Sequence, residues 1–223
     1  MNCAKCTQQN CQVQIKECDY PGCPMGNEEF FDAVEAEYRD PEIAAFYAGT
    51  LKSMRDSFGR LTRVDEAINF CKLMDFKKIG VVYCSGMLRE GRIANEAFKQ
   101  NGFETVSVGC KTGGYSSVEL AGDNALPPPT TAQQTRRDFS RPDFQYSRPE
   151  SMRKRAICNP IGQAMLMNAE KTDFNVVTGL CVGHDSLFLK YADAMCTVLV
   201  AKDRMLHHNT VADLYAREAF KTV

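Results

Sequence analysis

The sequence has a net charge of only −1 and lacks a long apolar stretch. Its 27 lysine and arginine residues nearly balance its 28 aspartate and glutamate residues, so charge gives no sign of a nucleic-acid or membrane-surface partner. The longest apolar stretches, such as residues 196–201, are far too short to span a bilayer. The first residues carry neither the basic nor the apolar region of a signal peptide. We therefore expect a soluble, cytoplasmic protein with no membrane partner.

Several common motifs are missing as well. The chain has no nucleophile elbow, no phosphate-loop lysine motif and no dinucleotide-binding glycine fingerprint. What it has in quantity is cysteine, with 11 in the chain. Because so many reduced thiols are easily oxidised in air, this composition favours a reducing or anaerobic habitat.

Many of these cysteines are concentrated in the first 23 residues, a segment with little else to fold around. Sulfur atoms at this density suit either a metal ion or disulfides, and disulfides do not persist inside cells. Metal binding is therefore the stronger interpretation, with unliganded thiols in a frayed terminus as the plain alternative. The cysteines of this segment are Cys3, Cys6, Cys11, Cys18 and Cys23.

The spacing of these cysteines suggests which of them bind the metal. Cys3 and Cys6 form a Cys-x2-Cys pair, which lets two sulfurs face one ion and is the usual half of a tetrahedral site. Cys11 and either Cys18 or Cys23 would complete the set, and we expect Cys18 to be the spare. The spacing does not separate zinc from an iron–sulfur cluster, although the Cys-Pro dipeptide at 23–24 is similar to the end of ferredoxin cluster motifs.

The rest of the chain predicts helices, and then strands alternating with helices. After the cysteine-rich segment 1–26, residues 27–77 form a helical region expected to pack on the core. Asn27, Asp40 and Thr62 stand at the starts of its three helices. Residues 78–223 form an α/β domain. Its expected strands are 79–84, 104–110, 174–181 and 196–201, and its expected helices are a stretch ending at Gln100, then 160–169, 183–191 and a last helix with Thr210 and Asp213 as its capping box.

Apolar strands that alternate with helices predict a mostly parallel sheet of four or more strands, with helices on both faces. A long loop without periodicity interrupts this domain at about 112–155. Loops of this length are usually functional lids or disordered insertions. Its second half, Arg136–Arg155, is rich in arginine and aromatic residues and suits single-stranded nucleic acid. The near-neutral chain disfavours that partner, because affinity for phosphate backbones comes mainly from positive charge.

A second group of cysteines is expected at one edge of the sheet. Cys84, Cys110 and Cys181 close three of the predicted strands, and Cys158 stands just before a helix. Because the carboxyl ends of parallel strands gather where this fold class binds ligands, we expect these thiols to converge. They could be catalytic, hold a second metal or cluster, or be small buried core residues.

Polar residues flank the same edge. His184 and Asp185 follow Cys181 and could handle protons, although they could equally cap a helix and bond within the loop. Backbone N–H groups at the helix starts after Cys84 and Cys181 are expected to lower the pKa of these thiols. Asp203 could orient a histidine or pair with an arginine. The candidate substrate-binding residues are Ser85, Gly86, Gly183, Lys202, Arg204 and His208.

Three stretches, 158–164, 179–188 and 202–209, resemble an uncharacterised family of predicted metal-binding proteins, the domain of unknown function 1847, found largely in anaerobic bacteria and archaea. The resemblance implies metal binding and this fold, but no reaction. His207 departs from the family pattern, and the segment 122–155 is longer than usual. Carried over by position, the family's N-terminal ligands fall on Cys3, Cys6, Cys11 and Cys23, and its core cysteines on Cys84, Cys110, Cys158 and Cys181.

Two functions follow from these residues. The first is an enzyme that performs redox or thiol/sulfur chemistry on a small anionic molecule at the strand-end cysteines. Zinc or an iron–sulfur cluster would then be structural or electron-transferring at the N-terminal cysteines. The second is a non-catalytic metal or redox sensor, or a small-ligand carrier, that uses the same residues. Cys71 and Cys196 are expected to be core residues, and nothing in the sequence sets the oligomeric state.

Overall fold

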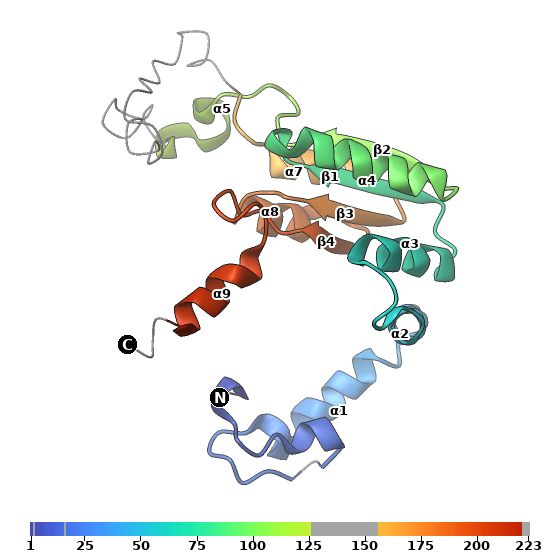
Figure 1. Ribbon diagram of the computed structural model, residues 1–223, viewed down its shortest axis with the longest axis vertical. Helices are drawn as coiled ribbons and strands as arrows, with labels where there is room; N and C mark the ends of the chain where they lie inside the picture. The colour runs from blue at the N-terminus through green and yellow to red at the C-terminus, as the bar shows by residue number, and fades with distance from the viewer. Residues whose placement is uncertain (2, 16, 126–155, 220–223) are drawn as a thin grey trace. The chain divides into compact units, whose positions relative to one another are not determined.

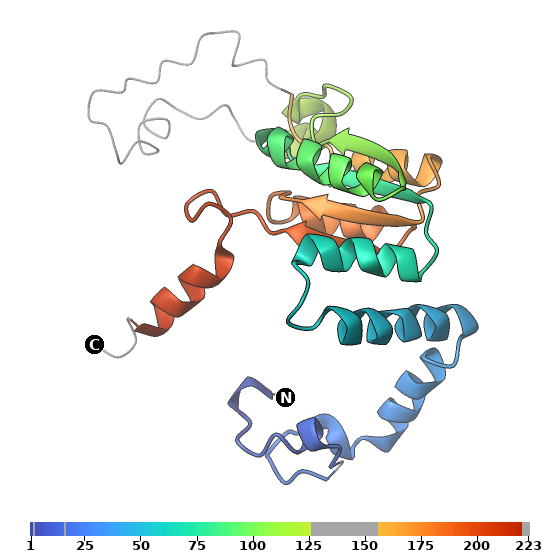
Figure 2. The same cartoon turned by 45° about the vertical axis from the view of Figure 1, so that its right-hand side comes forward.

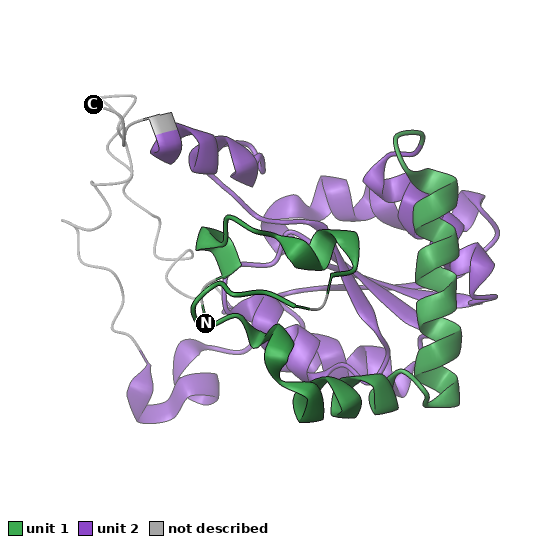
Figure 3. Cartoon of the chain, turned by 90° about the horizontal axis from the view of Figure 1, so that it is seen from below, with its two compact units in different colours: residues 1–60 green, residues 61–223 purple. Residues whose placement is uncertain are grey.

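The computed structural model describes residues 1, 3–15, 17–125 and 156–219. The chain divides into two compact units, residues 1–60 and residues 61–223 (Figure 3). Within the described residues, no helix is both long and apolar enough to cross a membrane.

The first unit joins a cysteine-rich coil to two helices. Its cysteines lie in or near three short 3-10 turns, η1 (Cys3–Lys5), η2 (Asn10–Val13) and η3 (Pro24–Gly26). The helices α1 (Glu28–Glu37) and α2 (Pro41–Ser57) follow. The Asn27 side chain accepts a hydrogen bond from the Phe30 N–H at 3.2 Å, and Asp40 accepts from the Glu42 N–H at 2.9 Å. Both predicted N-caps are confirmed.

The second unit contains a sheet of four parallel strands, which confirms the predicted α/β class. The strands are β1 (Lys78–Tyr83), β2 (Glu104–Gly109), β3 (Phe174–Thr178) and β4 (Cys196–Val200), and their order across the sheet is β2-β1-β3-β4. β1 therefore has β2 on one side and β3 on the other. In open sheets of this kind, ligands bind at the carboxyl ends of the strands beside such a switch in direction.

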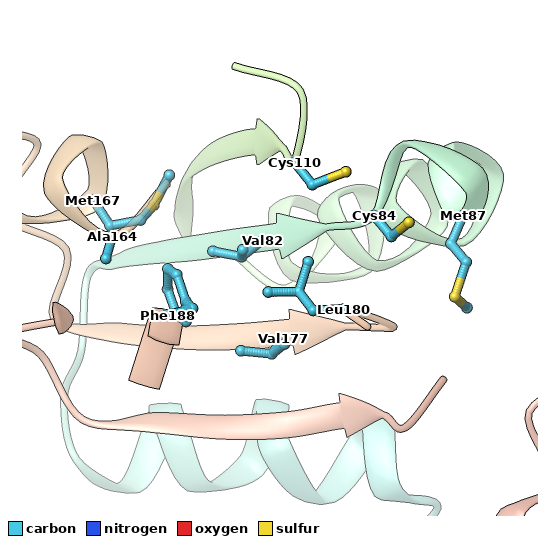
Figure 4. Packing of buried hydrophobic residues seen from close by; sticks show 9 residues of the cluster. All are labelled: Val82, Cys84, Met87, Cys110, Ala164, Met167, Val177, Leu180 and Phe188. Atoms are coloured by element: carbon cyan, nitrogen blue, oxygen red, sulfur yellow. The ribbon is translucent and has the colours of Figure 1, made fainter. Parts of the chain in front are cut away.

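Helices cover both faces of the sheet (Figures 1 and 2). The helices of this unit that flank the sheet are α3 (Arg63–Leu73), α4 (Leu88–Gln100), α7 (Pro160–Ala169) and α8 (His184–Tyr191). Side chains of β1 alternate between the faces. Tyr83 lies against Gly91 of α4, whereas Gly80 lies against Met167 of α7. Val82 packs with Met167 and with Phe188 of α8 on the second face (Figure 4).

β3 ends three residues earlier than the sequence suggests. The strand was expected to reach Cys181, but it stops at Thr178 because Gly179 adopts a left-handed φ of 66°. The Met87 sulfur fills the place where a Cβ on Gly179 would stand, so only glycine fits there without rearrangement. Cys181 therefore lies on a loop beyond the strand.

Two other expectations for local structure were wrong. The stretch after residue 112 is not without structure, since α5 (Ser117–Ala121) and η5 (Gly122–Asn124) lie in it, and Ser116 and Glu119 form a complete capping box. Thr210 was expected to precede the last helix as its cap, but α9 (Thr210–Ala219) already includes that residue. The arginine-rich segment Arg136–Arg155 lies outside the described residues.

Candidate functional site

The structure brings Cys84, Cys110 and Cys158 together at the carboxyl edge of the sheet. Cys84 and Cys110 follow directly after the neighbouring strands β1 and β2, as Figure 4 shows. The Cys158 thiol is hydrogen-bonded to the Cys110 thiol, with 3.4 Å between the sulfurs. The fourth expected member, Cys181, reaches the same edge from the loop after β3 and lies close enough to Cys158 to raise the pKa of that thiol, as Cys84 also does.

Backbone contacts hold Cys158 against Cys110. The Asn159 N–H donates to the Cys110 carbonyl at 2.7 Å, and the Ile157 N–H donates to the Tyr115 carbonyl at 2.8 Å. The Lys111 ammonium donates to the Ala156 carbonyl. The short segment before α7 is thus fastened to the loop after β2, and the two sulfurs are neighbours although 48 positions separate them in the chain.

Gln163 of α7 fixes the ends of the first two strands from below the site. Its side chain is fully buried. Its Nε2 donates to the Tyr83 carbonyl at 3.2 Å and to the Val108 carbonyl at 3.0 Å. Because Tyr83 precedes Cys84 and Val108 lies two residues before Cys110, this amide sets the positions of both thiols. We did not predict this role, although Gln163 lies in one of the stretches that carry the family resemblance.

Two cationic side chains from the loop after β4 reach the thiols. The Arg204 guanidinium donates to the Cys181 sulfur at 3.0 Å. The Lys202 ammonium donates to the Cys84 sulfur and lies 3.9 Å from the Cys181 sulfur. Lys202 therefore links the loops that follow β1 and β3. Both residues were expected to bind substrate, and both contact sulfur directly.

The pKa of the Cys158 thiol is lowered from its ordinary value. The hydrogen bond from Cys110 and the charge of Lys111 lower the pKa of Cys158 to about 7, against the opposing effects of burial and of Cys181 and Cys84. A large fraction of this half-buried thiol is ionised at neutral pH. Since the thiolate is the nucleophilic form, the lowered pKa favours Cys158 over Cys84 as a reacting sulfur.

Cys84 behaves in the opposite way, and the expected lowering of its pKa was wrong. Its hydrogen bond to Cys110 and its burial raise the pKa of Cys84 to about 12, although Lys202 and the Gly86 N–H act to lower it. The Gly86 N–H does donate to this sulfur, at 3.4 Å. One backbone donor and one ammonium do not outweigh a neighbouring sulfur and desolvation. Cys84 therefore keeps its proton at neutral pH.

Cys110 is the buried centre of the group, with 1% of its surface exposed. The Ser85 N–H donates to its sulfur at 3.2 Å, and the Ser85 hydroxyl lies 3.5 Å from it. Ser85 was expected to bind substrate, and its backbone instead supports a thiol. A hollow of about 360 Å³ lies at the end of β2, and none of the strand-end cysteines lines it. Its lining residues are Tyr83, Ser85, Leu88, Ser107, Val108, Gly109, Lys111 and Thr112.

The acidic and histidine candidates are engaged with the backbone. Asp185 accepts from the Gly183 N–H at 3.0 Å and from the Ser186 N–H at 2.8 Å, and so holds the turn into α8. His184 is the first residue of that helix. The hydrogen bonds described for this part of the chain do not bring its imidazole to a thiol. Gly183 adopts a left-handed φ of 85°, which a glycine tolerates.

His208 shapes the loop that carries the two cations. Its ring Nδ1 accepts from the Asp203 backbone N–H at 3.0 Å, and the His208 backbone N–H donates to the Asp203 carbonyl at 2.8 Å. The Asp203 carboxylate accepts from the backbone N–H groups of Met205 and Leu206. Asp203 thus pairs with a histidine through its backbone, while Arg204 turns to Cys181. His208 therefore holds the shape of this loop, and its expected role in substrate binding stays a prediction.

The remaining two cysteines of the second unit are core residues, as expected. Cys71 is fully buried in α3, and burial raises the pKa of its thiol to about 12. Cys196 donates to the Ala194 carbonyl at 3.1 Å and accepts from the Asn175 amide at 3.7 Å. Neither belongs to the strand-end group.

In the first unit, every N-terminal cysteine lines one hollow of about 360 Å³. The Gln9 N–H donates to the Cys6 sulfur at 3.5 Å and, with Cys18 as a further neighbour, lowers the pKa of Cys6. Cys18 also interacts with Cys23. Cys18 shares the hollow with the other cysteines, but its thiol donates a hydrogen bond to the Gln8 side chain at 3.2 Å, so its role as the spare stays a prediction. The cysteines that line the hollow are Cys3, Cys6, Cys11, Cys18 and Cys23.

This set of thiols fits a metal that prefers sulfur, because zinc sites and iron–sulfur clusters both take cysteine ligands. Among the residues that the structure describes, no three or more histidine, cysteine, aspartate or glutamate side chains are arranged as a finished ion site. The thiols share a hollow, and binding an ion there requires them to close on it.

The fold and the strand-end group define a parallel α/β protein whose sheet edge is lined with cysteine. The chain belongs to the family described as "Protein of unknown function (DUF1847)", which matches residues 23–135 and 140–199. The predicted family membership is confirmed. The match includes all the strand-end cysteines but begins only at Cys23, the last of the N-terminal group.

A curated relative spans nearly the whole chain. The chain is 32% identical over 221 residues to "Uncharacterized protein MJ0455" of Methanocaldococcus jannaschii. The alignment covers 99% of this chain and 97% of the relative. No solved structure matches the chain.

Proposed function

We propose that this protein performs redox or thiol chemistry on a small anionic molecule at the strand-end thiols. The observation that carries the proposal is the meeting of Lys202 and Arg204 with the sulfurs of Cys84 and Cys181. Cationic groups beside thiols stabilise thiolates and attract anions. Arg204 in addition has several N–H donors, and one hydrogen bond to sulfur leaves others for a carboxylate or similar group.

The same two cations argue for thiol chemistry rather than a second metal at this edge. A metal or cluster held by Cys84, Cys110, Cys158 and Cys181 would sit beside an ammonium and a guanidinium that already donate to two of the sulfurs. Positive charge at hydrogen-bond distance from the ligands disfavours another cation at the same place. A small anion meets no such opposition.

We propose that the N-terminal cysteines bind zinc or an iron–sulfur cluster. The donors would come from the thiols that line the hollow of the first unit. Zinc would hold this segment in one conformation, and a cluster would in addition supply or accept electrons. The second candidate function, a redox sensor or ligand carrier without turnover, uses the same thiols, and the buried position of Cys110 suits retention of a ligand.

The test is thiol–disulfide exchange measured without oxygen. The full-length protein is purified anaerobically, analysed for metals and sulfide, and mixed with a small acidic thiol and a small acidic disulfide. We expect exchange faster than the uncatalysed background. We expect most of that rate to be lost in the variant Lys202→Gln with Arg204→Gln, but not in the charge-matched control Arg92→Gln with Lys99→Gln on the exposed side of α4.

The possible results separate the candidates. Exchange above background supports an enzyme, and tight retention of the probe without exchange supports the carrier. The thiol proposal is abandoned if Cys84→Ser with Cys181→Ser changes neither thiol reactivity nor exchange. If the bound metal is lost in Cys3→Ser with Cys6→Ser but kept in the strand-end variants, the metal site lies in the first unit.

A further inference from the structure

We infer that Cys158 and Cys110 form a reactive dithiol pair that exchanges with small acidic disulfides, Cys158 attacking first and Cys110 resolving. This inference rests on the proposed thiol chemistry of the strand-end site and names its reacting pair and substrate class. The two sulfurs lie 3.4 Å apart. A disulfide bond is about 2.05 Å long, so small side-chain rotations bring them to bonding distance.

The exposure of the two residues sets their order of reaction. Cys158 is half-buried and is therefore open to a small molecule, whereas Cys110 is 1% exposed. An external disulfide can be attacked only by the accessible sulfur. The buried sulfur can still reach its neighbour on Cys158, because the two are already hydrogen-bonded.

The surroundings of each sulfur suit these roles. The Cys110 hydrogen bond and the Lys111 charge favour the thiolate form of Cys158, while burial and the neighbouring sulfurs of Cys181 and Cys84 oppose it. The Ser85 N–H points to the Cys110 sulfur at 3.2 Å and the Ser85 hydroxyl lies 3.5 Å away. Both can stabilise negative charge on Cys110 when it attacks in its turn.

The exchange balances in two steps. The Cys158 thiolate attacks one sulfur of the external disulfide, whose S–S bond breaks, and the first small thiolate leaves and takes a proton from water. Cys110 then loses its proton to water and attacks the Cys158 sulfur of the mixed disulfide, which releases the second small thiolate. Two protein thiols are thereby oxidised to one disulfide, and the external disulfide is reduced by two electrons to two thiols. Excess small dithiol reverses the reaction.

An acidic substrate is favoured by the cations around the pair. Lys111 directly follows Cys110 and lines the hollow of about 360 Å³ at the end of β2. Lys202 and Arg204 lie at the same edge on the Cys84 and Cys181 side. Among the titratable groups that act on Cys158, Lys111 is the one that is cationic at neutral pH. A disulfide with carboxylates is therefore held better than one with amines.

The first experiment uses the unmodified full chain. The reduced protein is mixed with one equivalent of oxidised glutathione as the acidic disulfide, remaining thiols are blocked, and tryptic peptides are analysed by mass. Trypsin separates the four strand-end cysteines into different peptides, with Cys110 in residues 100–111 and Cys158 in residues 156–171. We expect these two peptides to be joined. A strand-end disulfide that instead involves Cys84 or Cys181 overturns the inference.

The second experiment assigns the roles. In Cys110→Ser the resolving sulfur is gone, so we expect a stable mixed disulfide with the probe on Cys158, seen in the intact mass and in the peptide. In Cys158→Ser we expect no mixed disulfide at this edge, and in Cys196→Ser we expect the wild-type result. If the probe attaches to Cys110 or Cys84 in these variants, the assigned order is wrong. The wild-type crosslink decides the pairing even if a variant does not fold.

The third experiment tests the substrate class. Rates of mixed-disulfide formation in Cys110→Ser are compared for oxidised glutathione and for cystamine, a disulfide with two amines. Adding Lys111→Gln is expected to reduce the ratio of the acidic to the basic rate by about fivefold, the effect of one nearby charge in water. An unchanged ratio overturns the preference for acids. Exchange by wild-type protein without the Cys110–Cys158 crosslink would refute the pair but leave the proposed function standing.

Discussion

The Lys202 ammonium donates a hydrogen bond to the Cys84 sulfur, although β3 lies between β1 and β4 in the sheet. The loop after β4 therefore reaches across the end of β3 and contacts the loop after β1. The contact brings a positive charge to a thiol that keeps its proton at neutral pH. Because this thiol is neutral, it does not balance the charge of Lys202, which remains available to attract an anion at this edge.

The first prediction concerns this charge. In Lys202→Gln with Arg204→Gln, alkylation of the strand-end cysteines by anionic iodoacetate should slow by about fivefold more than alkylation by neutral iodoacetamide, because only the anion feels the lost charges. Peptide mass spectrometry after brief labelling gives both rates for each cysteine. The control pair Arg92→Gln with Lys99→Gln removes equal charge from α4 and should leave the ratio unchanged. Equal slowing with both reagents would count against an anion site.

The second prediction concerns the pH dependence of thiol reactivity. The pKa of Cys158 is lowered to about 7 by Cys110 and Lys111, against burial, Cys181 and Cys84, so its alkylation rate should rise through a midpoint near pH 7. Cys84, with a pKa raised to about 12, should react little below pH 10. Labelling between pH 5 and pH 10 followed by peptide analysis measures both. A Cys158 midpoint near that of a free cysteine, at about 8.5, would contradict this assignment.

The lowered pKa of Cys158 has a matching effect on stability. A group with a lowered folded-state pKa stabilises the fold above its unfolded pKa and loses that contribution as the pH falls through the folded value. Relative to Cys158→Ser, the wild-type protein should therefore gain stability as the pH rises from about 7 towards the ordinary cysteine value. Urea unfolding at several pH values measures this difference. A difference that shrinks over the same range would contradict the sign.

The third prediction concerns the turn after β3. Gly179→Ala should lower the free energy of unfolding by about 3 kcal/mol, because a left-handed backbone strains a Cβ by roughly 1–2 kcal/mol and overpacking against Met87 adds about 1–3 kcal/mol. Gly114→Ala is the matched control, since Gly114 has a similar φ of 68° and nothing within 4 Å of the added carbon. Its free energy of unfolding should fall only by the roughly 1–2 kcal/mol that the left-handed backbone costs. If urea unfolding shows equal losses of stability in the two variants, Met87 moves aside at no measurable cost.

The fourth prediction concerns the N-terminal thiols. Because Cys18 lines the same hollow as the other cysteines and interacts with Cys6 and Cys23, Cys18→Ser should reduce the metal content of the anaerobically purified protein about as much as Cys23→Ser. Cys71→Ser, a change at a buried thiol of α3, serves as the control for cysteine loss outside the first unit. Full metal content in Cys18→Ser would show that Cys18 is not a metal ligand, as the sequence predicts.

Local signals in the sequence carried most of the fold. The caps at Asn27 and Asp40 are formed as expected, because capping depends only on residues a few positions away. The parallel sheet followed from apolar strands between helices. The early end of β3 was missed because it depends on Met87, which approaches Gly179 from a distant part of the chain. The helix at 117–121 was overlooked although Ser116 and Glu119 carried its signal.

The sequence predicts which cysteines gather at the candidate site better than it predicts the chemical properties of each thiol. The gathering of the strand-end cysteines follows from the rule that parallel strands end together. The properties of each thiol do not follow from that rule, because they depend on contacts between loops. The raised pKa of Cys84 comes from Cys110, and the roles of Gln163 and Lys111 come from hydrogen bonds over long sequence separations. Such pairings are set by the tertiary structure.

The separation of the interacting groups along the chain also affects how the protein is made. Cys84 and Lys202 are 118 positions apart, and Lys202 follows the last strand of the sheet. On the ribosome, all the strand-end cysteines emerge before the cations that act on Cys84 and Cys181. The nascent chain therefore passes through a period in which these sulfurs lack their charged partners. The two cations can join the site only after the last strand of the sheet, β4, has been made.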